Sequence, residues 1–239
     1  MKKQRTFLAV GLALSGLMVT QVVVEAGITG VSLGTSAPPP TLGGWTMTAF
    51  PADTVNSVYQ ASYADVTAVP GPGGGLTFNQ ALTHDIAGDL NTGWATWSHG
   101  YTGDVYDTLG SADPTSVTLG LPAATHAFYL YVEPTPYSSF TITATAQDGT
   151  GISQTVFGGG GAAGFGFYTS GLDFLTSITI TGLNSAYTDS GLNTDFAIGE
   201  FGISAVPEPS TVIAGALMLL PFGLQGMRCL RNRKPVSGN

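Results

Sequence analysis

The stretch FTITATA, residues 140–146, decides the fold class because apolar and threonine side chains alternate along it. A period of two is typical of a β-strand that has one buried and one solvated face. The sequence QDGTG follows at residues 147–151, and its pair Asp148 and Gly149 is a strong signal for a tight hairpin turn. A second strand-like stretch, ISQTVF, comes next. The pattern therefore predicts an antiparallel pair of strands.

Similar short segments lie on both sides of this pair. Strands are predicted at residues 117–121, 127–132, 140–146, 152–157, 165–169, 177–181 and 196–203. The stretch AFYLYV at residues 127–132 is apolar on both faces, which predicts a central strand. Many short strands separated by glycine-rich turns indicate a sandwich or a barrel. We predict an all-β fold, an antiparallel β-sandwich of the jelly-roll type.

The first part of this domain is less regular. SAPPPTLGG at residues 36–44 and VPGPGGG at residues 69–75 predict loops, with short strands at residues 45–50 and 76–78. No fixed-period repeat and no separate second domain is indicated. Residues 27–205 are therefore predicted to be one β-sandwich domain.

Positive charge is confined to the two ends of the chain. The seven cationic residues are Lys2, Lys3, Arg5, Arg228, Arg231, Arg233 and Lys234. Residues 27–206 contain no lysine or arginine, although thirteen of the fifteen acidic residues lie there. Such a region does not attract a phosphate backbone, which excludes nucleic acid as a partner. It also offers no lysine or arginine to a phosphate or carboxylate substrate.

The N-terminus has the layout of a secretory signal peptide. A basic start is followed by an apolar run at residues 7–19, and Val24 and Ala26 are small residues at the positions that signal peptidase reads. We predict that residues 1–26 are a signal peptide, removed after Ala26. The alternative is an uncleaved N-terminal anchor, for which the apolar run is short.

A second apolar run, TVIAGALMLLPFGLQGM, lies at residues 211–227. At ~1.5 Å per residue it covers about 25 Å, slightly less than the ~30 Å hydrocarbon core of a bilayer. The basic tail at residues 228–234 would hold its end on the cytoplasmic side. We predict a single transmembrane helix at residues 211–227 with the domain outside, which is the orientation that the signal peptide also gives.

The residues that flank this run carry a family resemblance. Val206, Pro207, Glu208, Pro209 and Ser210 precede it, and Arg228, Arg231, Arg233 and Lys234 follow it. In order, spacing and position, residues 206–234 resemble the PEP-CTERM sorting signal of Gram-negative bacteria. A looser likeness of residues 95–203 to ectodomains of that family implies a fold and no activity.

The resemblance implies recognition and cleavage by an exosortase, a membrane-embedded transpeptidase, near Pro207, Glu208 and Pro209. It also implies passage through the inner membrane to the cell surface or the extracellular space, in association with exopolysaccharide and biofilm. The local chemistry is compatible, because each proline pushes the residue before it towards an extended backbone that a protease can thread. The alternative is a stiff proline spacer before an ordinary anchor.

Motifs for enzymatic chemistry are weak. GGGAAG at residues 159–164 has the G-x-G-x-x-G spacing, but a strand-like FGFYT follows where a helix is needed, so a flexible hairpin loop is predicted. G-x-S-x-G is absent, and His84, His99 and His126 lack the spacing of zinc ligands. We therefore predict a non-enzymatic protein. The two acids of a glycosidase need not be neighbours in sequence, so a secreted carbohydrate-active enzyme is the alternative.

Calcium is the one cofactor that the acidic residues suggest. Oxygen-rich loops are predicted at residues 84–89 and 104–107, and Glu200 interrupts the apolar stretch FAIGEFGI. A buried Glu200 needs a metal or a polar donor, because no lysine or arginine is near in sequence. Asp104, Asp107 and Glu200 are candidate ligands of a structural Ca²⁺. The alternative is that these acids are solvated.

Aromatic residues gather in the stretch WATWSHGY, residues 94–101. If exposed and coplanar, the rings of Trp94, Trp97 and Tyr101 would form a platform on which a sugar stacks. The alternative is that the tryptophans belong to the core. On a regular strand Trp94 and Trp97 would face opposite sides.

Together these patterns predict an exported protein of the cell surface or extracellular matrix. It would be processed by signal peptidase and exosortase, held by the membrane through its C-terminal helix before processing, and associated with polysaccharide in a structural role. A carbohydrate-active enzyme or carbohydrate-binding module on the same sandwich is one alternative. A plain membrane-anchored protein without sorting is another.

The sorting prediction depends on Glu208 between its two prolines. Glu208→Ala is expected to leave the C-terminal tail uncleaved in the native host, because the acidic side chain is part of what the exosortase recognises. Mass spectrometry of the protein recovered from cells measures this directly. Cleavage of the variant at the wild-type rate would show that the motif is only a spacer.

Overall fold

The computed structural model describes residues 27–58, 65–88, 94–113, 115–135, 138–170, 173–182 and 195–204. The predicted signal peptide, the sorting motif at residues 206–210, the apolar run at residues 211–227 and the basic tail lie outside the described residues. Within the described ranges the regular structure consists of strands and one short 3₁₀ turn, Pro72–Gly74, which confirms the all-β prediction. None of these segments forms a helix with the length and apolar character needed to cross a bilayer.

Thirteen strands follow one another along the chain. They are β1 Gly27–Gly34, β2 Thr41–Leu42, β3 Trp45–Ala49, β4 Val66–Val69, β5 Leu76–Ile86, β6 Asp104–Asp107, β7 Ser116–Thr125, β8 Ala127–Pro134, β9 Ser139–Ala146, β10 Gly151–Phe157, β11 Ala163–Ser170, β12 Leu175–Thr181 and β13 Phe196–Ser204. All pairings between these strands are antiparallel, as predicted.

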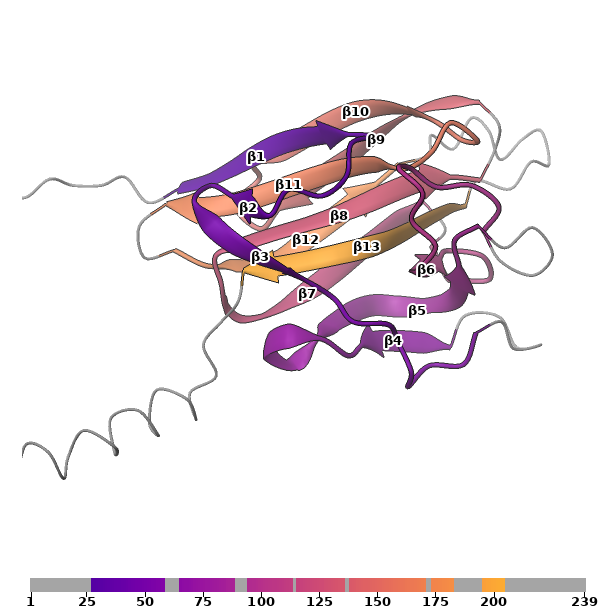
Figure 1. The fold of residues 1–239 in the computed structure, drawn as a ribbon, viewed down its shortest axis with the longest axis horizontal. Helices are drawn as coiled ribbons and strands as arrows, with labels where there is room; N and C mark the ends of the chain where they lie inside the picture. The colour runs from indigo at the N-terminus through magenta and orange to yellow at the C-terminus, as the bar shows by residue number, and fades with distance from the viewer. Residues whose placement is uncertain are drawn as a thin grey trace, which may run out of the picture.

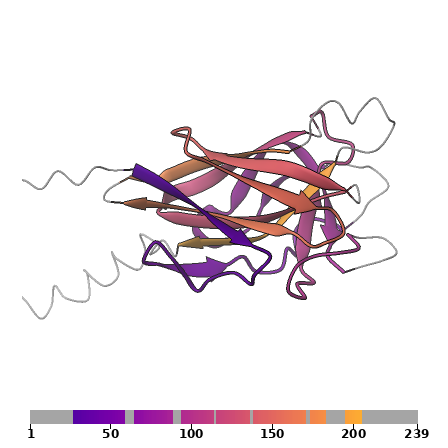
Figure 2. The same ribbon diagram turned by 90° about the horizontal axis from the view of Figure 1, so that it is seen from above.

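The strands form two layers (Figures 1 and 2). The first sheet has the order β1-β11-β8-β13-β6, and the second sheet has the order β10-β9-β12-β7. Strand β5 joins them, because Thr77 and Phe78 pair with β7 while residues 83–86 pair with β6. At the opposite edges the hydroxyl of Ser32 on β1 donates a hydrogen bond to Gln154 on β10. The layers are therefore linked on both sides, and the sandwich is nearly closed.

The stretch FTITATA forms strand β9 as its alternation predicts. Phe140, Ile142, Ala144 and Ala146 are buried, while the threonines between them are exposed or half-buried. The turn to β10 is closed by a 2.9 Å hydrogen bond from the amide of Ala146 to the carbonyl of Thr150. Gly149 lies within it at φ 90°, a left-handed conformation that glycine adopts without strain. The predicted hairpin is confirmed.

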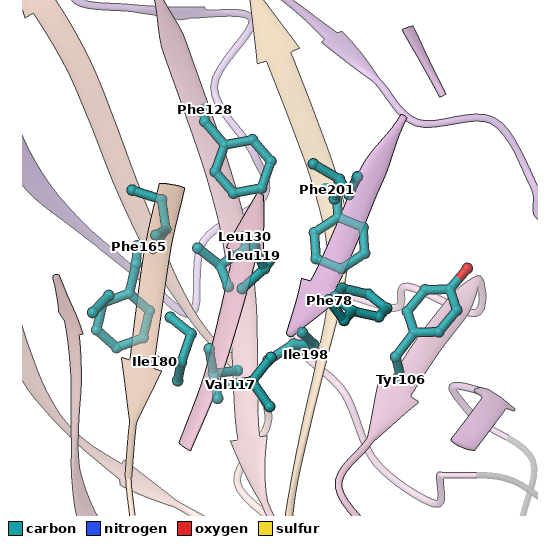
Figure 3. Packing of buried hydrophobic residues seen from close by; sticks show 14 of the residues in the cluster. Phe78, Tyr106, Val117, Leu119, Phe128, Leu130, Phe165, Ile180, Ile198 and Phe201 are labelled. Carbon is teal, nitrogen blue, oxygen red and sulfur yellow. The ribbon is translucent and has the colours of Figure 1, made fainter. Parts of the chain in front are cut away.

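The core fills the space between the two sheets (Figure 3). It contains Phe128, Leu130, Phe165 and Ile198 from the first sheet and Val117, Leu119 and Ile180 from the second sheet. All seven side chains are fully buried. Removing apolar surface from water stabilises the fold by roughly 25 cal/mol per Å², so this layer is the main source of stability.

Strand β8 is buried on both faces, which confirms the prediction of a central strand. Phe128, Leu130 and Val132 point into the core. Tyr129 and Tyr131 belong to a separate cluster on the outer face of the first sheet, where Leu33 and other residues cover them. The hydroxyl of Tyr131 donates a 2.5 Å hydrogen bond to the carbonyl of Ser36. The outer face is therefore closed in part by the N-terminal segment.

Three sequence-based predictions are wrong in detail. Residues 84–86 end strand β5 and residues 104–107 form strand β6, so neither region is the oxygen-rich loop that was expected. These two strands pair with each other, with Ile86 opposite Asp104. The glycine-rich stretch at residues 159–164 connects β10 to β11 in the other sheet and does not form a hairpin. The polar residues of β5 and β6 belong to strands because β5 and β6 pair with each other, although they are distant in sequence.

Buried and partly exposed side chains alternate along β9, so substitutions at two neighbouring positions test which face of the strand is buried. Ile142→Ala is expected to lower the free energy of unfolding by about 2–5 kcal/mol, because it leaves a cavity in the core. The neighbouring Thr143→Ala removes a 2.8 Å contact with Ser153 near the surface. It should cost only about 0.5–1 kcal/mol. Urea unfolding measures both, and equal losses would contradict the assigned faces.

Candidate functional site

A β-bulge in strand β13 turns an acidic side chain out of the core. Gly199 pairs with Tyr131 and Gly202 with Tyr129, so three steps along β13 match two steps along β8. Glu200 occupies the extra position with φ 50°, a left-handed conformation that is unusual for a residue other than glycine. Without the bulge, alternation from Ile198 would place Glu200 in the core. With it, Phe201 packs into the core and Glu200 lies on the outer face.

The bulge coincides with a change of neighbour along the edge of β13. Residues 197–199 pair with β6, and residues 202–204 pair with β3. Near these two pairings lies a cavity of about 230 Å³, lined by core residues such as Tyr106 and Phe201 and by Tyr129 and Glu200 of the outer face. Its walls include Tyr101, Asp104, Tyr106, Tyr129, Glu200 and Phe201. Phe50 also lines it, so two carboxylates and five aromatic rings meet at the point where β13 changes its neighbour.

The carboxylate of Glu200 is held by two neutral or weakly basic donors. The indole Nε1 of Trp97 donates to Oε2 at 3.0 Å, and Nε2 of His99 lies 2.6 Å from Oε1. The side chain is only 9% exposed. Burial raises the pKa of Glu200, and the hydrogen bonds from His99 and Trp97 offset part of that rise. The expectation that a buried Glu200 needs a polar partner is confirmed.

The carboxylate of Asp104 is held in a similar way. Its Oδ1 lies 2.8 Å from Nε2 of His84, and its Oδ2 accepts a 2.8 Å hydrogen bond from the amide of Asp53. The other ring nitrogen of His84 lies 3.2 Å from the carbonyl of Asn56, so both nitrogens face acceptors. Burial alone would lower the pKa of His84, but the hydrogen bond and charge of Asp104, together with Asp53, raise it above its ordinary value. The acceptors at both ring nitrogens and the raised pKa favour the protonated, positively charged form of His84.

Tyr106 links this pair to a third carboxylate. Its ring stacks on His84 with centroids 5.0 Å apart, and its hydroxyl donates a 2.7 Å hydrogen bond to Asp53. Asp53 also accepts hydrogen bonds from the backbone and side chain of Asn56. Burial would raise the pKa of Asp53, but these hydrogen bonds lower it overall. The carboxyl is therefore an anion over the working pH range.

Tyr129 presents an unused hydroxyl to the cavity. The residue is 3% exposed, and its ring lies across Gly202, where an added Cβ would come 2.1 Å from the ring carbon Cζ. No hydrogen bond of this hydroxyl is found within the described part of the chain. Burial, followed by the charge of Glu200, raises the pKa of Tyr129 to about 12. The hydroxyl oxygen is therefore accessible in the cavity, where it can form a hydrogen bond to a ligand or to water.

The predicted aromatic platform is arranged differently from the expectation. The indole of Trp94 donates a 3.1 Å hydrogen bond to Glu133, and that of Trp97 donates to Glu200, so both turn towards the first sheet. The expectation that they face opposite sides held for a regular strand, and it does not apply because residues 95–97 do not belong to a strand. The rings of Trp97 and Tyr101 are inclined by 42°, so they are not coplanar. Of the three predicted residues, Tyr101 lines the cavity.

Glu133 explains how this aromatic segment is fixed. It is completely buried. Besides Trp94, it accepts hydrogen bonds from the hydroxyl of Thr96 at 2.7 Å and from the amides of Gly159 and Gly161 at 3.1 and 3.3 Å. Leaving such a group unpaired would cost several kcal/mol, so these donors hold both loops against the sheet.

Of the three predicted calcium ligands, Asp104 and Glu200 line the same cavity, and Asp107 does not. Asp104 contacts His84, Glu200 contacts His99, and Asp107 lies beside Asp85. Positions 104 and 107 are three apart on strand β6, so their side chains point to opposite faces. Within the described ranges, no group of three or more His, Cys, Asp or Glu residues could hold a metal ion. A structural Ca²⁺ stays a prediction, and these three residues by themselves do not form its site.

Sequence reasoning did not single out His84, His99 or Tyr129 as members of one site. One signal was available, because histidine is the only side chain left to carry positive charge where lysine and arginine are absent. The neighbour of His84 in sequence is Asp85, but the pairing of β5 with β6 places His84 opposite Tyr106 and beside Asp104. Tyr129 was assigned to the core together with the rest of AFYLYV.

A second group of acids lies away from the cavity. Asp107 on β6 is beside Asp85 on β5 and Asp195 at the start of β13, and all three are buried. Burial, followed by the hydrogen bond that protonated Asp107 donates to Asp85 and by the charges of both acids, raises the pKa of Asp107 to about 8. Burial also raises the pKa of Asp195. Asp107 therefore keeps its proton near neutral pH.

Comparison with known proteins adds little to this geometry. No protein-family model and no curated protein matches the chain. Two solved structures of mutants of a family 29 carbohydrate-binding module, CBM29-2, are weakly similar. One, complexed with mannohexaose, has 12% identity and a TM-score of 0.24, covering 52% of this chain and 92% of that chain. The other has 12% identity and a TM-score of 0.25, covering 56% and 98%. Likeness at this level supports no inference about this chain.

The protonated Asp107 makes stability depend on pH. Between the ordinary value of 3.8 and about 8, the folded protein retains a proton that the unfolded chain has lost. The free energy of unfolding should therefore fall as pH rises through this window. His84, with its raised pKa, acts in the same direction above about pH 6.5.

Asp107→Asn mimics the protonated acid and should reduce this slope. Urea unfolding at several pH values measures it, and Asp148→Asn, in the exposed turn after β9, is the control and should leave the slope unchanged. A slope in Asp107→Asn as steep as in the wild type would contradict the assignment.

Proposed function

We propose that this chain is an exported, non-enzymatic surface protein whose jelly-roll domain binds a saccharide in the cavity beside the Glu200 bulge. The strand order supports the jelly roll. The eight strands β6 to β13 form two packed sheets with the orders β6-β13-β8-β11 and β7-β12-β9-β10. The first of the eight strands, β6, therefore lies beside the last, β13, and the second, β7, lies beside the seventh, β12. The resemblance of residues 206–234 to a sorting signal supports export, with signal peptidase and an exosortase as the proposed processing enzymes.

The observation that carries the binding function is the unpaired hydroxyl of Tyr129 inside the cavity. Sugars combine hydroxyl groups, which donate and accept hydrogen bonds, with apolar C–H faces that pack on aromatic rings. The cavity offers both features, because the rings of Tyr101, Tyr106 and Phe201 form its walls beside two carboxylates. Binding sites of this kind are mostly apolar, with a few polar groups that fix the orientation of the ligand.

The size of the cavity limits the ligand. At about 230 Å³ it is smaller than the ~300–1,000 Å³ of most sites for drug-sized molecules. It therefore suits a single sugar ring, such as the end or a side branch of a polysaccharide. A long groove along several sugars is not part of this proposal.

The position of the chain ends supports processing from a membrane. Gly27 at the start of β1 pairs with Ser170, and the Ser204 hydroxyl at the end of β13 accepts a hydrogen bond from the amide of His126. The amide of Thr169 donates a hydrogen bond to the carbonyl of the same His126, so the first and last described residues lie at the same end of the sandwich (Figure 1). A C-terminal membrane helix would then hold the domain by this end until an exosortase released it.

A secreted carbohydrate-active enzyme is the second candidate, because Asp104 and Glu200 line the same cavity. All four carboxylate oxygens already have a donor from the protein: His84 and Asp53 for one acid, Trp97 and His99 for the other. A nucleophile or general acid needs an oxygen directed at the substrate, which favours binding over hydrolysis. Release of new reducing ends from a polysaccharide panel, abolished by Asp104→Asn, would establish the enzyme instead.

Tyr129→Phe tests the binding function because it removes only the hydroxyl. It should weaken binding of the saccharide by about 2- to 12-fold, the range for one hydrogen bond of 0.5–1.5 kcal/mol. Isothermal titration of the full chain in detergent measures this against oligosaccharides selected on a glycan array. Tyr168→Phe on β11, away from the cavity, is the matched control. Equal affinities for the two variants would remove the cavity as the site.

A further inference from the structure

Negative charge exceeds positive charge around the cavity. Asp104 and Glu200 line it, and Asp53 lies behind Tyr106. Only His84 and His99 can oppose these three carboxylates, since residues 27–206 contain no lysine or arginine. Each histidine is already engaged with one of the acids. A ligand entering the cavity therefore meets a net negative environment.

We infer that the cavity selects a sugar with a free, protonated amino group, that is, an unacetylated hexosamine. This inference rests on the proposed function, and it names the class of sugar that the same site takes. The ammonium group would lie near Glu200 and Asp104, whose oxygens each have one protein partner and can accept a second hydrogen bond. The Tyr129 hydroxyl would accept another of its hydrogen bonds. The sugar ring would pack on the aromatic walls.

The aromatic walls favour a cation as well as a sugar ring. Tyr101, Tyr106, Tyr129 and Phe201 surround the same space. Ammonium groups are attracted to the faces of such rings within about 6 Å, and more strongly where water is excluded. Burial and the nearby carboxylates also raise the pKa of Tyr101 and of Tyr106, so both hydroxyls stay neutral. The rings thus add to the attraction of the acids without adding charge.

Sugars of other charge are disfavoured for two different reasons. A uronic acid or a phosphorylated sugar would bring negative charge to a site whose two histidines, His84 and His99, are already hydrogen-bonded to its acids. A neutral sugar would cover Asp104 and Glu200, whose side chains are 14% and 9% exposed, without supplying an opposing charge. Removing the remaining water from a carboxylate is costly unless a new partner replaces it. A cationic sugar offsets more of that cost than the hydroxyl groups of a neutral sugar, because a hydrogen bond between two charged groups is stronger.

Three oligosaccharides that differ at one position make the test. Trimers of β-1,4-linked glucosamine, N-acetylglucosamine and glucose share a backbone and carry an ammonium, an acetamide and a hydroxyl group at carbon 2. Isothermal titration of the full chain at about pH 6, below the range in which amines lose their proton, compares them. Glucosamine should bind at least about tenfold more tightly than either of the others. Its advantage should shrink as salt rises from about 20 to about 500 mM.

Substitution of Glu200 and Asp104 tests whether these two acids cause the preference for the glucosamine trimer. Glu200→Gln should reduce the advantage of glucosamine over glucose about tenfold while the glucose trimer still binds. Asp104→Asn is a second variant of unchanged size, and thermal unfolding of both shows whether the domain is intact. Asp148→Asn removes a charge from the exposed turn after β9, so it should leave all three affinities unchanged.

The outcomes separate this inference from the proposed function. Equal binding of the three trimers, with a loss in Tyr129→Phe, would overturn the preference for an amino sugar and leave the saccharide site in place. Tighter binding of the neutral trimer would also overturn the preference. Binding of none of the three at millimolar concentration would also overturn the preference for an amino sugar, and absence of binding to every sugar on the glycan array would contradict the saccharide site itself.

Discussion

The structure depends on how a domain without lysine or arginine satisfies its buried carboxylates. Glu133 is completely buried and accepts hydrogen bonds from an indole, a hydroxyl and two backbone amides. Glu200 and Asp104 each use a histidine and one further N–H group. An unpaired buried charge would cost several kcal/mol, so these donors fix the position of the segments that carry them. The loop with Trp94 and Trp97 is held on the first sheet for this reason.

One extra residue in strand β13 places one of these hydrogen-bonded carboxylates, that of Glu200, at the cavity. The bulge at Glu200 moves a carboxylate from the core side of the sheet to the outer side, where histidine and tryptophan can reach it. The bulge also lies between the part of β13 that pairs with β6 and the part that pairs with β3. At this point no described strand pairs with that edge of β13, so the sheet is interrupted beside Glu200. Gly202 is needed next to it, because any Cβ would collide with the ring of Tyr129. Backbone strain and the open cavity thus occur together, as is common at binding sites.

Sequence patterns predict the parts of this molecule that are regular and local. The strands from β7 to β13 follow from alternation and turn residues, and FTITATA with its turn is confirmed in detail. The site itself could not be predicted, because His84 and Asp104 meet only through the pairing of β5 with β6. The bulge at Glu200 is also invisible to an argument that assumes a strict period of two. Tyr129 lies in an apolar run, and nothing local marks its hydroxyl as free.

The central claim is that histidine replaces the missing lysine and arginine as the cation beside buried acids. Nuclear magnetic resonance of the His84 ring tests this directly, since the ring nitrogens report protonation as pH is varied. The account predicts a titration midpoint above the ordinary value of 6.5, and a lower midpoint in the Asp104→Asn variant. A midpoint at or below 6.5 in the wild type, unchanged by that substitution, would contradict it.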